Sequence, residues 1–168
     1  RQDGRSASLT APNGQAQQGV LAASVADAHL SAAQVGALEA HGTGTALGDP
    51  IEVGSLTAVF LAQRYTATPL MVGSLKANAG HTEPGAGLAG ALKLHMQLRD
   101  ASLSPNAQLR TLNPHVGGAL RNRVVCVLQT QVVAKAAEGV RAMAMGGVSS
   151  FGYSGTIAHA ILRWEGPE

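Results

Sequence analysis

Glycine marks the points in this sequence where one structural pattern gives way to the next. Apolar runs with strand character alternate with segments of helical periodicity, and the boundaries between them are rich in glycine. Glycine supplies 21 of the 168 residues, so the tight connections that such an alternation needs are available along the whole chain. The pattern predicts a single domain of the α/β class.

The same pattern predicts where the helices and strands lie. The expected helices cover 12–30, 49–63 and 85–100, and the expected strands cover 35–40, 70–75, 124–133, 140–148 and 157–164. Asp49, Pro50 and Glu52 are spaced like an N-cap, a first helical residue and the end of a capping box. Residues 85–90 are nearly all Gly and Ala, so another element should pack very close to them. A glycine-rich turn is expected over 149–156.

Charged residues are scarce, at 13% of the chain. In soluble domains about 25% of the residues are charged, so we expect other protein surfaces to cover much of the surface of this chain. The most apolar stretch, 70–75, is far shorter than the roughly 18 residues of a membrane-spanning helix, and no membrane association is expected. The net charge of +2 comes from scattered residues without interleaved aromatics, which argues against nucleic-acid binding.

Cys126 is the single cysteine, which excludes an internal disulfide framework and favours a reduced, intracellular setting. The cytoplasm is the default location, with a plastid or another compartment left open. The apolar run 124–128 around this cysteine predicts a core residue and not a nucleophile. Residues 1–5 contain neither an initiator Met nor a signal-peptide pattern, so we expect the chain to be cut from a longer protein.

Polar side chains gather in three loops that each follow an expected strand. The residues concerned are His41, Thr43 and Thr45 in the first loop, Lys76, Asn78 and His81 in the second, and 151–156 in the third. The carboxyl ends of parallel strands lie at one edge of a sheet, so the two histidines and the lysine should come together. Neutral imidazoles can donate hydrogen bonds to a carbonyl oxygen that becomes an enolate, and a nearby ammonium can fix their protonation. This combination predicts carbonyl or thioester chemistry.

Two other kinds of site are weaker alternatives. A zinc site would need a third ligand beside the two histidines, and no His-x-x-x-His or Cys-x-x-Cys pair occurs, so no metal site is expected. Residues 85–90 match the dinucleotide motif G-x-G-x-x-G, but the preceding strand ends about ten residues too early. Close helix packing explains these glycines better. The aromatic pair Phe151 and Tyr153 fits either a core position or the wall of a pocket.

Four motifs occur in order along the chain: EAHGTGT at 39–45, GDPIE at 48–52, GSLKANAGHTE at 73–83 and GVSSFGYSGTIAH at 147–159. With the segment 3–14, they resemble the β-ketoacyl synthases, and specifically a ketosynthase domain of a modular polyketide synthase. The resemblance implies a thiolase-like layered α/β sandwich of two similar halves, usually a homodimer. Residues 1–168 would be the C-terminal half of one ketosynthase domain, with the N-terminal half as its partner.

The resemblance also implies roles for the catalytic loops. His41 and His81 would bind the malonyl thioester carbonyl and promote decarboxylation, and Lys76 would orient and support His81. Thr43 and Thr45 would hydrogen-bond the phosphopantetheine arm of the acyl carrier protein, which carries the substrate. No cofactor is expected to be bound by the chain itself.

Supporting roles follow in the same way. Asp49 would fix its loop, with Glu52 and Asn78 as further supporting residues. The turn residues Phe151, Gly152 and Tyr153 would border the acyl site, with Tyr153 in the position of the family's gating aromatic. Departures from the family pattern at Ala77, Ala79, Ser154 and Ile157 weaken the assignment of the turn more than that of the histidines.

The implied activity is decarboxylative Claisen condensation of an acyl thioester with a malonyl-type extender, in polyketide or fatty acid synthesis. The family's nucleophilic cysteine belongs to the first half, upstream of Arg1, so the intact domain would be the acyltransferase and the isolated chain is expected to be inactive. The alternative is a structural or partner fragment that takes no part in condensation. Acyl chain length and extender choice are left open.

Overall fold

A five-stranded sheet forms the centre of the protein in the computed structural model, which describes residues 1–4, 11–62, 64, 69–120, 126–134 and 144–166. The sheet has the order β4-β2-β1-β6-β7, with β1 (Ala37–Glu39), β2 (Leu70–Gly73), β4 (Cys126–Leu128), β6 (Met145–Phe151) and β7 (Ile157–Arg163). The first four strands in this order are parallel, and β7 pairs antiparallel with β6. Two further strands, β3 (Ser102–Leu103) and β5 (Val133–Ala134), form a separate antiparallel pair.

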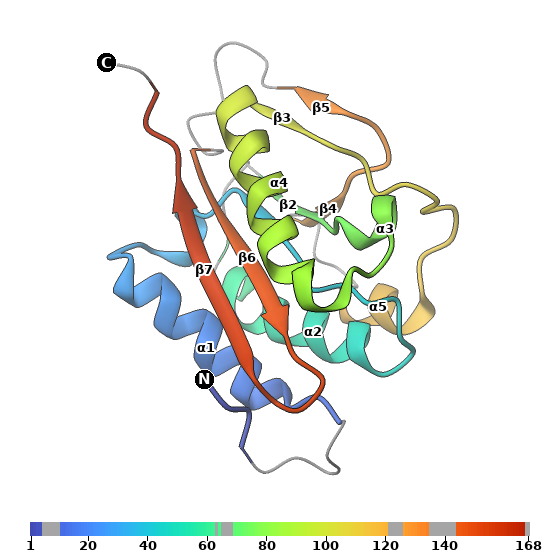
Figure 1. Ribbon diagram of the computed structural model, residues 1–168. Helices are drawn as coiled ribbons and strands as arrows, with labels where there is room; N and C mark the ends of the chain where they lie inside the picture. The colour runs from blue at the N-terminus through green and yellow to red at the C-terminus, as the bar shows by residue number, and fades with distance from the viewer. Residues whose placement is uncertain (5–10, 63, 65–68, 121–125, 135–143, 167–168) are drawn as a thin grey trace.

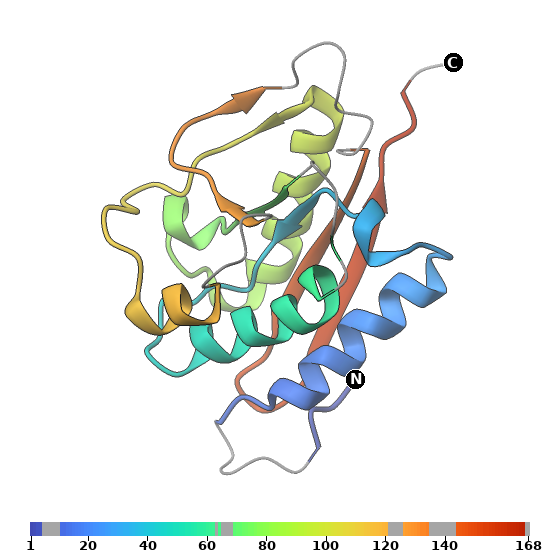
Figure 2. The ribbon, with the colours of Figure 1, turned by 180° about the vertical axis from the view of Figure 1, so that it is seen from behind.

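Helices lie on both faces of the main sheet. They are α1 (Gly14–Asp27), α2 (Gly48–Leu56, continued by a π-helical turn over Thr57–Leu61), α3 (Lys76–Ala79), α4 (Ala86–Asp100) and α5 (Pro114–Ala119). Short 3-10 turns occur at Ala32–Gln34 and Glu83–Gly85. Helix α4 crosses the face seen in Figure 1, and α1 and α2 cover the opposite face, which Figure 2 shows. The expected α/β class is therefore confirmed.

The two faces of the sheet are buried by alternate residues of the same strands. Leu38 and Val72, which are paired in register, belong to the core on the α1 and α2 side. Their neighbours Ala37 and Met71, also paired, belong to the core beneath α4. Because both faces are covered, these parallel strands are apolar at consecutive positions instead of alternating, apart from Glu39 at the end of β1.

The small residues at the start of α4 allow the helix to lie very close to the sheet. A Cβ atom on Gly87 would be 2.8 Å from Ser150 Oγ, and one on Gly90 would be 3.2 Å from Glu39 Cγ. The predicted close packing is confirmed. It accounts for the glycine spacing that resembled a dinucleotide motif.

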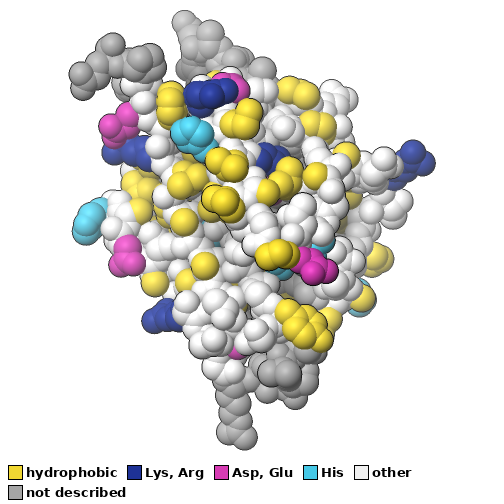
Figure 3. Space-filling view, viewed as in Figure 1, with side chains coloured by type: hydrophobic (Ala, Val, Ile, Leu, Met, Phe, Trp, Pro, Cys, Tyr) yellow, Lys and Arg dark blue, Asp and Glu magenta, His cyan; other side chains and the backbone are white. Residues whose placement is uncertain are grey.

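The opposite side of α4 carries large apolar side chains that face outward. Leu88, Leu92 and Met96 are 70%, 56% and 51% exposed, and their spacing of four residues puts them along one side of the helix. Hydrophobic side chains gather over α4 in the space-filling view of Figure 3. We call these three residues the outer α4 face. Such a row of exposed apolar residues is typical of an interaction surface.

The expected capping box at the start of α2 is wrong. The helix begins at Gly48, and its N-cap residue Leu47 makes no side-chain capping bond. Asp49 instead accepts a hydrogen bond from the Gly44 N–H at 3.1 Å, and Glu52 accepts from loop amides described below. Main-chain N–H groups of the preceding loop therefore bind both carboxylates, which the sequence pattern predicts to cap the start of the helix.

Two expectations, about one strand and about the turn after β6, also need correction. The segment 124–133 is not one strand, because β4 ends at Leu128 and β5 belongs to the other sheet. The turn expected from residue 149 begins after Phe151, where β6 ends. The expected strand starts at 124 and 140 lie outside the described residues.

The short elements α3, β3 and α5 were not predicted, because two to six residues are too few to show a period. No described helix is long and apolar enough to cross a membrane.

Candidate active site

Three chain segments meet at the carboxyl edge of the parallel strands. His41 follows β1, Lys76 and His81 follow β2, and Phe151 ends β6. The ring centroids of His41 and His81 are 5.9 Å apart with perpendicular planes, and those of His41 and Phe151 are 5.7 Å apart. The expected approach of the two histidines is confirmed.

Main-chain amides determine which nitrogen of each imidazole carries the proton. The Phe151 N–H donates to His41 Nδ1 at 3.3 Å, and the Glu83 N–H donates to His81 Nδ1 at 3.1 Å. A ring whose Nδ1 accepts a hydrogen bond carries its proton on Nε2. Burial, followed by the charges of Lys76 and His81, lowers the pKa of His41 to about 4, so this ring is neutral at pH 7. The arrangement provides two Nε2–H donors at one edge of the sheet.

The main chain of His41 is held from two sides. Glu52 Oε1 accepts from the His41 N–H at 2.7 Å, and Oε2 accepts from the Gly42 N–H at 2.9 Å. Lys76 Nζ donates to the His41 carbonyl. Glu52 is 5% exposed, and burial raises its pKa to about 7. Burial also lowers the pKa of Lys76. The Lys76 amine thus acts on His41, whereas the family resemblance assigned it to His81.

The loop after His41 is closed by its own hydroxyl and carboxylate groups. The Gly48 N–H donates to Thr45 Oγ1 at 3.0 Å, and the hydroxyls of Thr43 and Thr45 are 3.4 Å apart. The hydrogen bond from Gly44 to Asp49 ties the same loop to α2. The position of Asp49 therefore suits its implied role in fixing this loop.

A cavity of about 470 Å³ lies against these side chains. The expected site residues that line it are His41, Thr43, Thr45, Glu52, His81, Phe151, Gly152 and Tyr153. Asn13 and Gln17, at the start of α1, also line it and were not anticipated, since nothing in their sequence context indicates a site. Tyr153 is 80% exposed at the rim, so the wall position and not the core position is correct for it.

A second cavity, of about 540 Å³, shares Thr43, Glu52 and His81 with the first. The other expected site residues among its lining are Asp49 and Lys76. Asn78 does not line either cavity, and its Oδ1 accepts from the Ala107 N–H at 3.3 Å. Every expected site residue except Asn78 therefore lines at least one of the two cavities.

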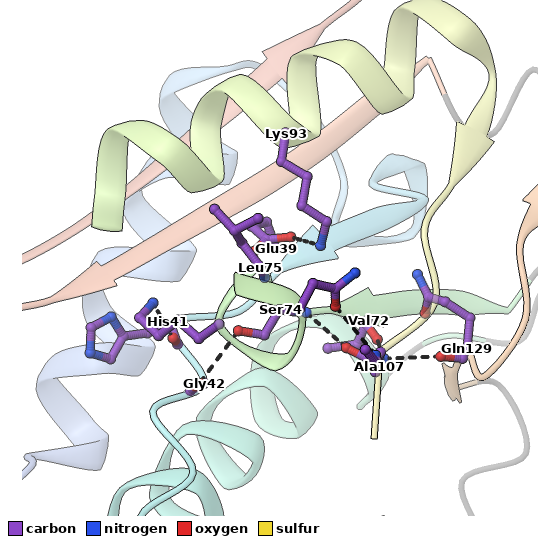
Figure 4. Close-up of polar contacts among 12 residues, drawn as sticks. Glu39, His41, Gly42, Val72, Ser74, Leu75, Lys93, Ala107 and Gln129 are labelled. Atoms are coloured by element: carbon purple, nitrogen blue, oxygen red, sulfur yellow. Dashed lines mark hydrogen bonds and ion pairs between the residues drawn. The ribbon is translucent and has the colours of Figure 1, made fainter. Parts of the chain in front are cut away.

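Glu39 is a functional candidate that sequence reasoning overlooked. It is 3% exposed, and its carboxylate pairs with Lys93 Nζ at 2.5 Å and accepts from the Leu75 N–H (Figure 4). Burial raises its pKa, although Lys93 opposes the shift. Glu39 thereby links β1, α4 and the chain leaving β2. The sequence signal that could have indicated Glu39 is a charged residue at the end of an apolar strand, because a buried charge needs a partner.

Cys126 has the surroundings of a core residue and not those of a nucleophile. Cys126 packs against the core on the α1 and α2 side, and burial raises the pKa of its thiol to about 11, which confirms the predicted core position. Within the described residues, no group of three or more His, Cys, Asp or Glu side chains could hold a metal ion.

Comparison with known proteins defines the class. Residues 1–110 match the family described as "Beta-ketoacyl synthase, C-terminal domain". The chain is 47% identical over 162 residues to the spectinabilin polyketide synthase system protein NorA' of Streptomyces orinoci, covering 96% of this chain and 4% of that protein. It is 44% identical over 163 residues to the mycoketide-CoA synthase of Mycobacterium tuberculosis, covering 96% of this chain and 4% of that protein.

Solved structures agree with the sequence relatives. The oxazolomycin ketosynthase domain OzmH KS7 of Streptomyces albus JA3453 superposes with a TM-score of 0.88 at 32% identity, over 100% of this chain and 29% of that chain. The ketosynthase from module 6 of the bacillaene synthase of Bacillus subtilis gives a TM-score of 0.85 at 30% identity, over 99% and 29%. The chain therefore belongs to the β-ketoacyl synthase family, as the C-terminal part of a ketosynthase domain with the expected thiolase-like fold. It spans less than a third of each of these relatives.

Proposed function

We propose that this chain supplies the carbonyl-binding half of a β-ketoacyl synthase active site. In the intact domain it would act on a malonyl-type thioester carried by the phosphopantetheine arm of an acyl carrier protein. The two Nε2–H donors of His41 and His81, each directed by a main-chain amide on Nδ1, carry this proposal. Donors that are oriented before the reaction stabilise a developing oxyanion without reorganisation.

The proposed reaction has two steps. Loss of CO₂ from the malonyl thioester leaves the electron pair of the broken C–C bond on the α-carbon and the thioester oxygen. The Nε2–H groups of His41 and His81 would donate to that oxygen. The α-carbon then attacks the acyl thioester on a cysteine of the N-terminal half, and that cysteine leaves as thiolate when the C–C bond has formed.

The lining and the volume of the first cavity support a place for the carrier arm. Thr43 and Thr45 border it with hydroxyl groups that can bond the amides of a phosphopantetheine chain, and the exposed Tyr153 stands at its rim. A cavity of about 470 Å³ is within the range of small-molecule sites, which is roughly 300–1,000 Å³.

The outer α4 face supports the N-terminal half as the covering partner. Leu88, Leu92 and Met96 form an exposed apolar row, and the chain spans 29% of the oxazolomycin ketosynthase it superposes on. Burial of one such side chain contributes about 1.5–3 kcal/mol to the stability of the assembled domain.

We also propose a homodimer of intact domains in the cytoplasm, on the basis of the family resemblance and the single reduced cysteine.

The test uses the purified intact domain with malonyl carrier protein and an acyl thioester. His41→Ala and His81→Ala should each lower condensation by about two orders of magnitude or more, because each removes a positioned donor. His115→Ala, a change at an exposed histidine on α5, is the control and should leave the rate unchanged. Near-normal turnover in either of the first two variants would disprove the donor role. An inactive unsubstituted domain would instead favour a partner fragment that takes no part in condensation.

A further inference from the structure

Asn106 lies in the segment between β3 and α5, and its side chain contacts the main chain at the end of β2. Its Oδ1 accepts from the Ser74 N–H at 2.9 Å, and its Nδ2 donates to the carbonyls of Val72 at 3.1 Å and Gln129 at 3.3 Å. The Asn106 N–H also donates to the Gln129 carbonyl at 2.7 Å. Both N–H groups and the oxygen of the side-chain amide are therefore hydrogen-bonded to main-chain groups.

These contacts fix the chain at the point where it leaves the sheet toward the site. Gly73 is the last residue of β2, and Lys76 begins α3 three residues later. The two peptide N–H groups in between are held by side chains of other segments, that of Ser74 by Asn106 and that of Leu75 by Glu39. No strand pairing constrains these two amides among the described residues.

A neighbouring contact ties the same segment to α3 itself. The Ala107 N–H, adjacent to Asn106, donates to Asn78 Oδ1 at 3.3 Å. Asn78 lies in α3 with Lys76, whose amine reaches the His41 carbonyl. A short path of hydrogen bonds thus leads from Asn106 to both loops of the proposed site.

We propose that Asn106 is a positioning residue for Lys76 and His81, because it sets the direction in which the chain leaves β2. The inference rests on the proposed function, since it concerns the same reaction. Asn106 acts through Ser74 and Leu75 on the segment that carries the two side chains. It donates nothing to the substrate itself.

The chemistry of the amide separates this role from that of a simple space filler. Asn106→Asp has nearly the same shape and keeps an acceptor for the Ser74 N–H, but its carboxylate has no N–H for the Val72 and Gln129 carbonyls. Asn106→Ala loses all three side-chain bonds. Both changes should displace the Ser74 peptide, and Asn106→Asp serves as the test if Asn106→Ala does not fold.

Asn113→Ala provides a matched control. Asn113 is an asparagine of the same connecting segment, but its Oδ1 accepts from the His115 N–H at the start of α5. The control therefore removes a capping hydrogen bond of the same chemical type, without touching the end of β2.

The experiment uses the intact domain and measures two reactions separately. One is transfer of an acyl group onto the cysteine of the N-terminal half, and the other is condensation with malonyl carrier protein. We expect kcat for condensation to fall about 10- to 100-fold in both Asn106 variants, as small displacements of catalytic groups do. The KM for malonyl carrier protein should change by no more than about twofold. Acyl transfer should stay close to that of Asn113→Ala, although the melting temperature should be lower, because each Asn106 variant loses more hydrogen bonds than the control.

Each remaining outcome decides the matter. Condensation in the Asn106 variants as fast as in Asn113→Ala would overturn the positioning role, and so would an equal fall in acyl transfer and condensation, which indicates general damage to the fold. If the unsubstituted domain does not condense, the proposed function fails and this inference fails with it. An active unsubstituted domain with active Asn106 variants overturns the inference alone.

Discussion

His41 and His81 lie side by side in the proposed site, but different kinds of contact hold them. His41 is half-buried, and groups from three other elements bind it: Glu52 binds its N–H, Lys76 binds its carbonyl, and the Phe151 N–H binds its ring. Its position therefore depends on how α2, α3 and β6 pack around β1.

His81 depends on its own loop. It is exposed, and the hydrogen bond to its ring comes from the Glu83 N–H, two residues further along the chain. The turn before it contains Gly80 at φ +78°. The difference teaches that two equivalent donors can have unequal sensitivities: changes in the packing of α2, α3 and β6 should disturb His41 directly, whereas His81 should respond to changes in its own turn and at the end of β2, where its segment leaves the sheet.

The largest expected effect comes from removing the carboxylate behind His41. Glu52→Ala leaves two part-buried N–H groups without their acceptor, at about 1–2 kcal/mol each, so the free energy of unfolding of the intact domain should fall by about 2–4 kcal/mol. The counterpart on the other loop, Glu83→Ala, keeps the main-chain donor to His81 and should change it by less than about 0.5 kcal/mol. Denaturant unfolding of both variants measures the contrast. Equal losses would show that the two loops are held in the same way.

A smaller difference is expected between two glycine substitutions. Gly42 at φ +48° and Gly80 at φ +78° and ψ −179° both adopt positive-φ backbone conformations that cost an L-residue about 1–3 kcal/mol. A Cβ on Gly42 would also lie 2.7 Å from Ser74 Oγ, whereas the space around Gly80 is open. Gly42→Ala should therefore destabilise the domain by about 1–3 kcal/mol more than Gly80→Ala, from overpacking. Thermal unfolding compares them, and a larger loss for Gly80→Ala would contradict the packing argument.

The last expected effect is a pH dependence from Glu52, which is small for each pH unit. Its pKa rises from 4.5 to about 7 on folding, so the folded state binds a proton that the unfolded state releases in this range. The free energy of unfolding should therefore decrease as pH rises from about 4.5 to about 7, by at most about 1.4 kcal/mol per pH unit, and then level off. Glu52→Gln has no such titration.

His41 contributes with the opposite sign. Its pKa falls from 6.5 to about 4 on folding, so its contribution to stability grows as pH rises through that range. This contribution is common to the unsubstituted domain and Glu52→Gln, so the difference between their stability curves isolates Glu52. Curves that remain parallel from about pH 4.5 to about pH 7 would refute the raised pKa.

Much of the fold was predictable because apolar runs and helical periodicity, which extend over many residues, determine it. The helices α1 and α4 and the strands β1 and β2 lie within their expected ranges, since each presents a clear apolar run or helical period. The capping box at Asp49 and Glu52 failed for a physical reason. The pattern contains no information about the loop amides of His41, Gly42 and Gly44, which compete for the same carboxylates.

The site was predictable to the extent that it follows strand ends. The approach of His41 and His81 follows from parallel topology alone. Asn106 was beyond reach, because it lies 32 residues after Ser74 in a segment without periodicity and becomes important only when the chain folds back onto β2. Contacts of this kind are a property of tertiary structure and leave no local pattern.

The perpendicular arrangement of the two imidazole rings also has a meaning for inhibitor chemistry. In the proposed reaction both Nε2–H groups donate to one oxygen, and rings at 88° would do so from different directions, which suits an sp² oxygen with two lone pairs. A compound with one strongly polarised carbonyl or enolate oxygen should therefore bind better than a compound of equal size that spreads its acceptors apart. The angle between two side chains thus becomes a rule for selecting ligands of this site.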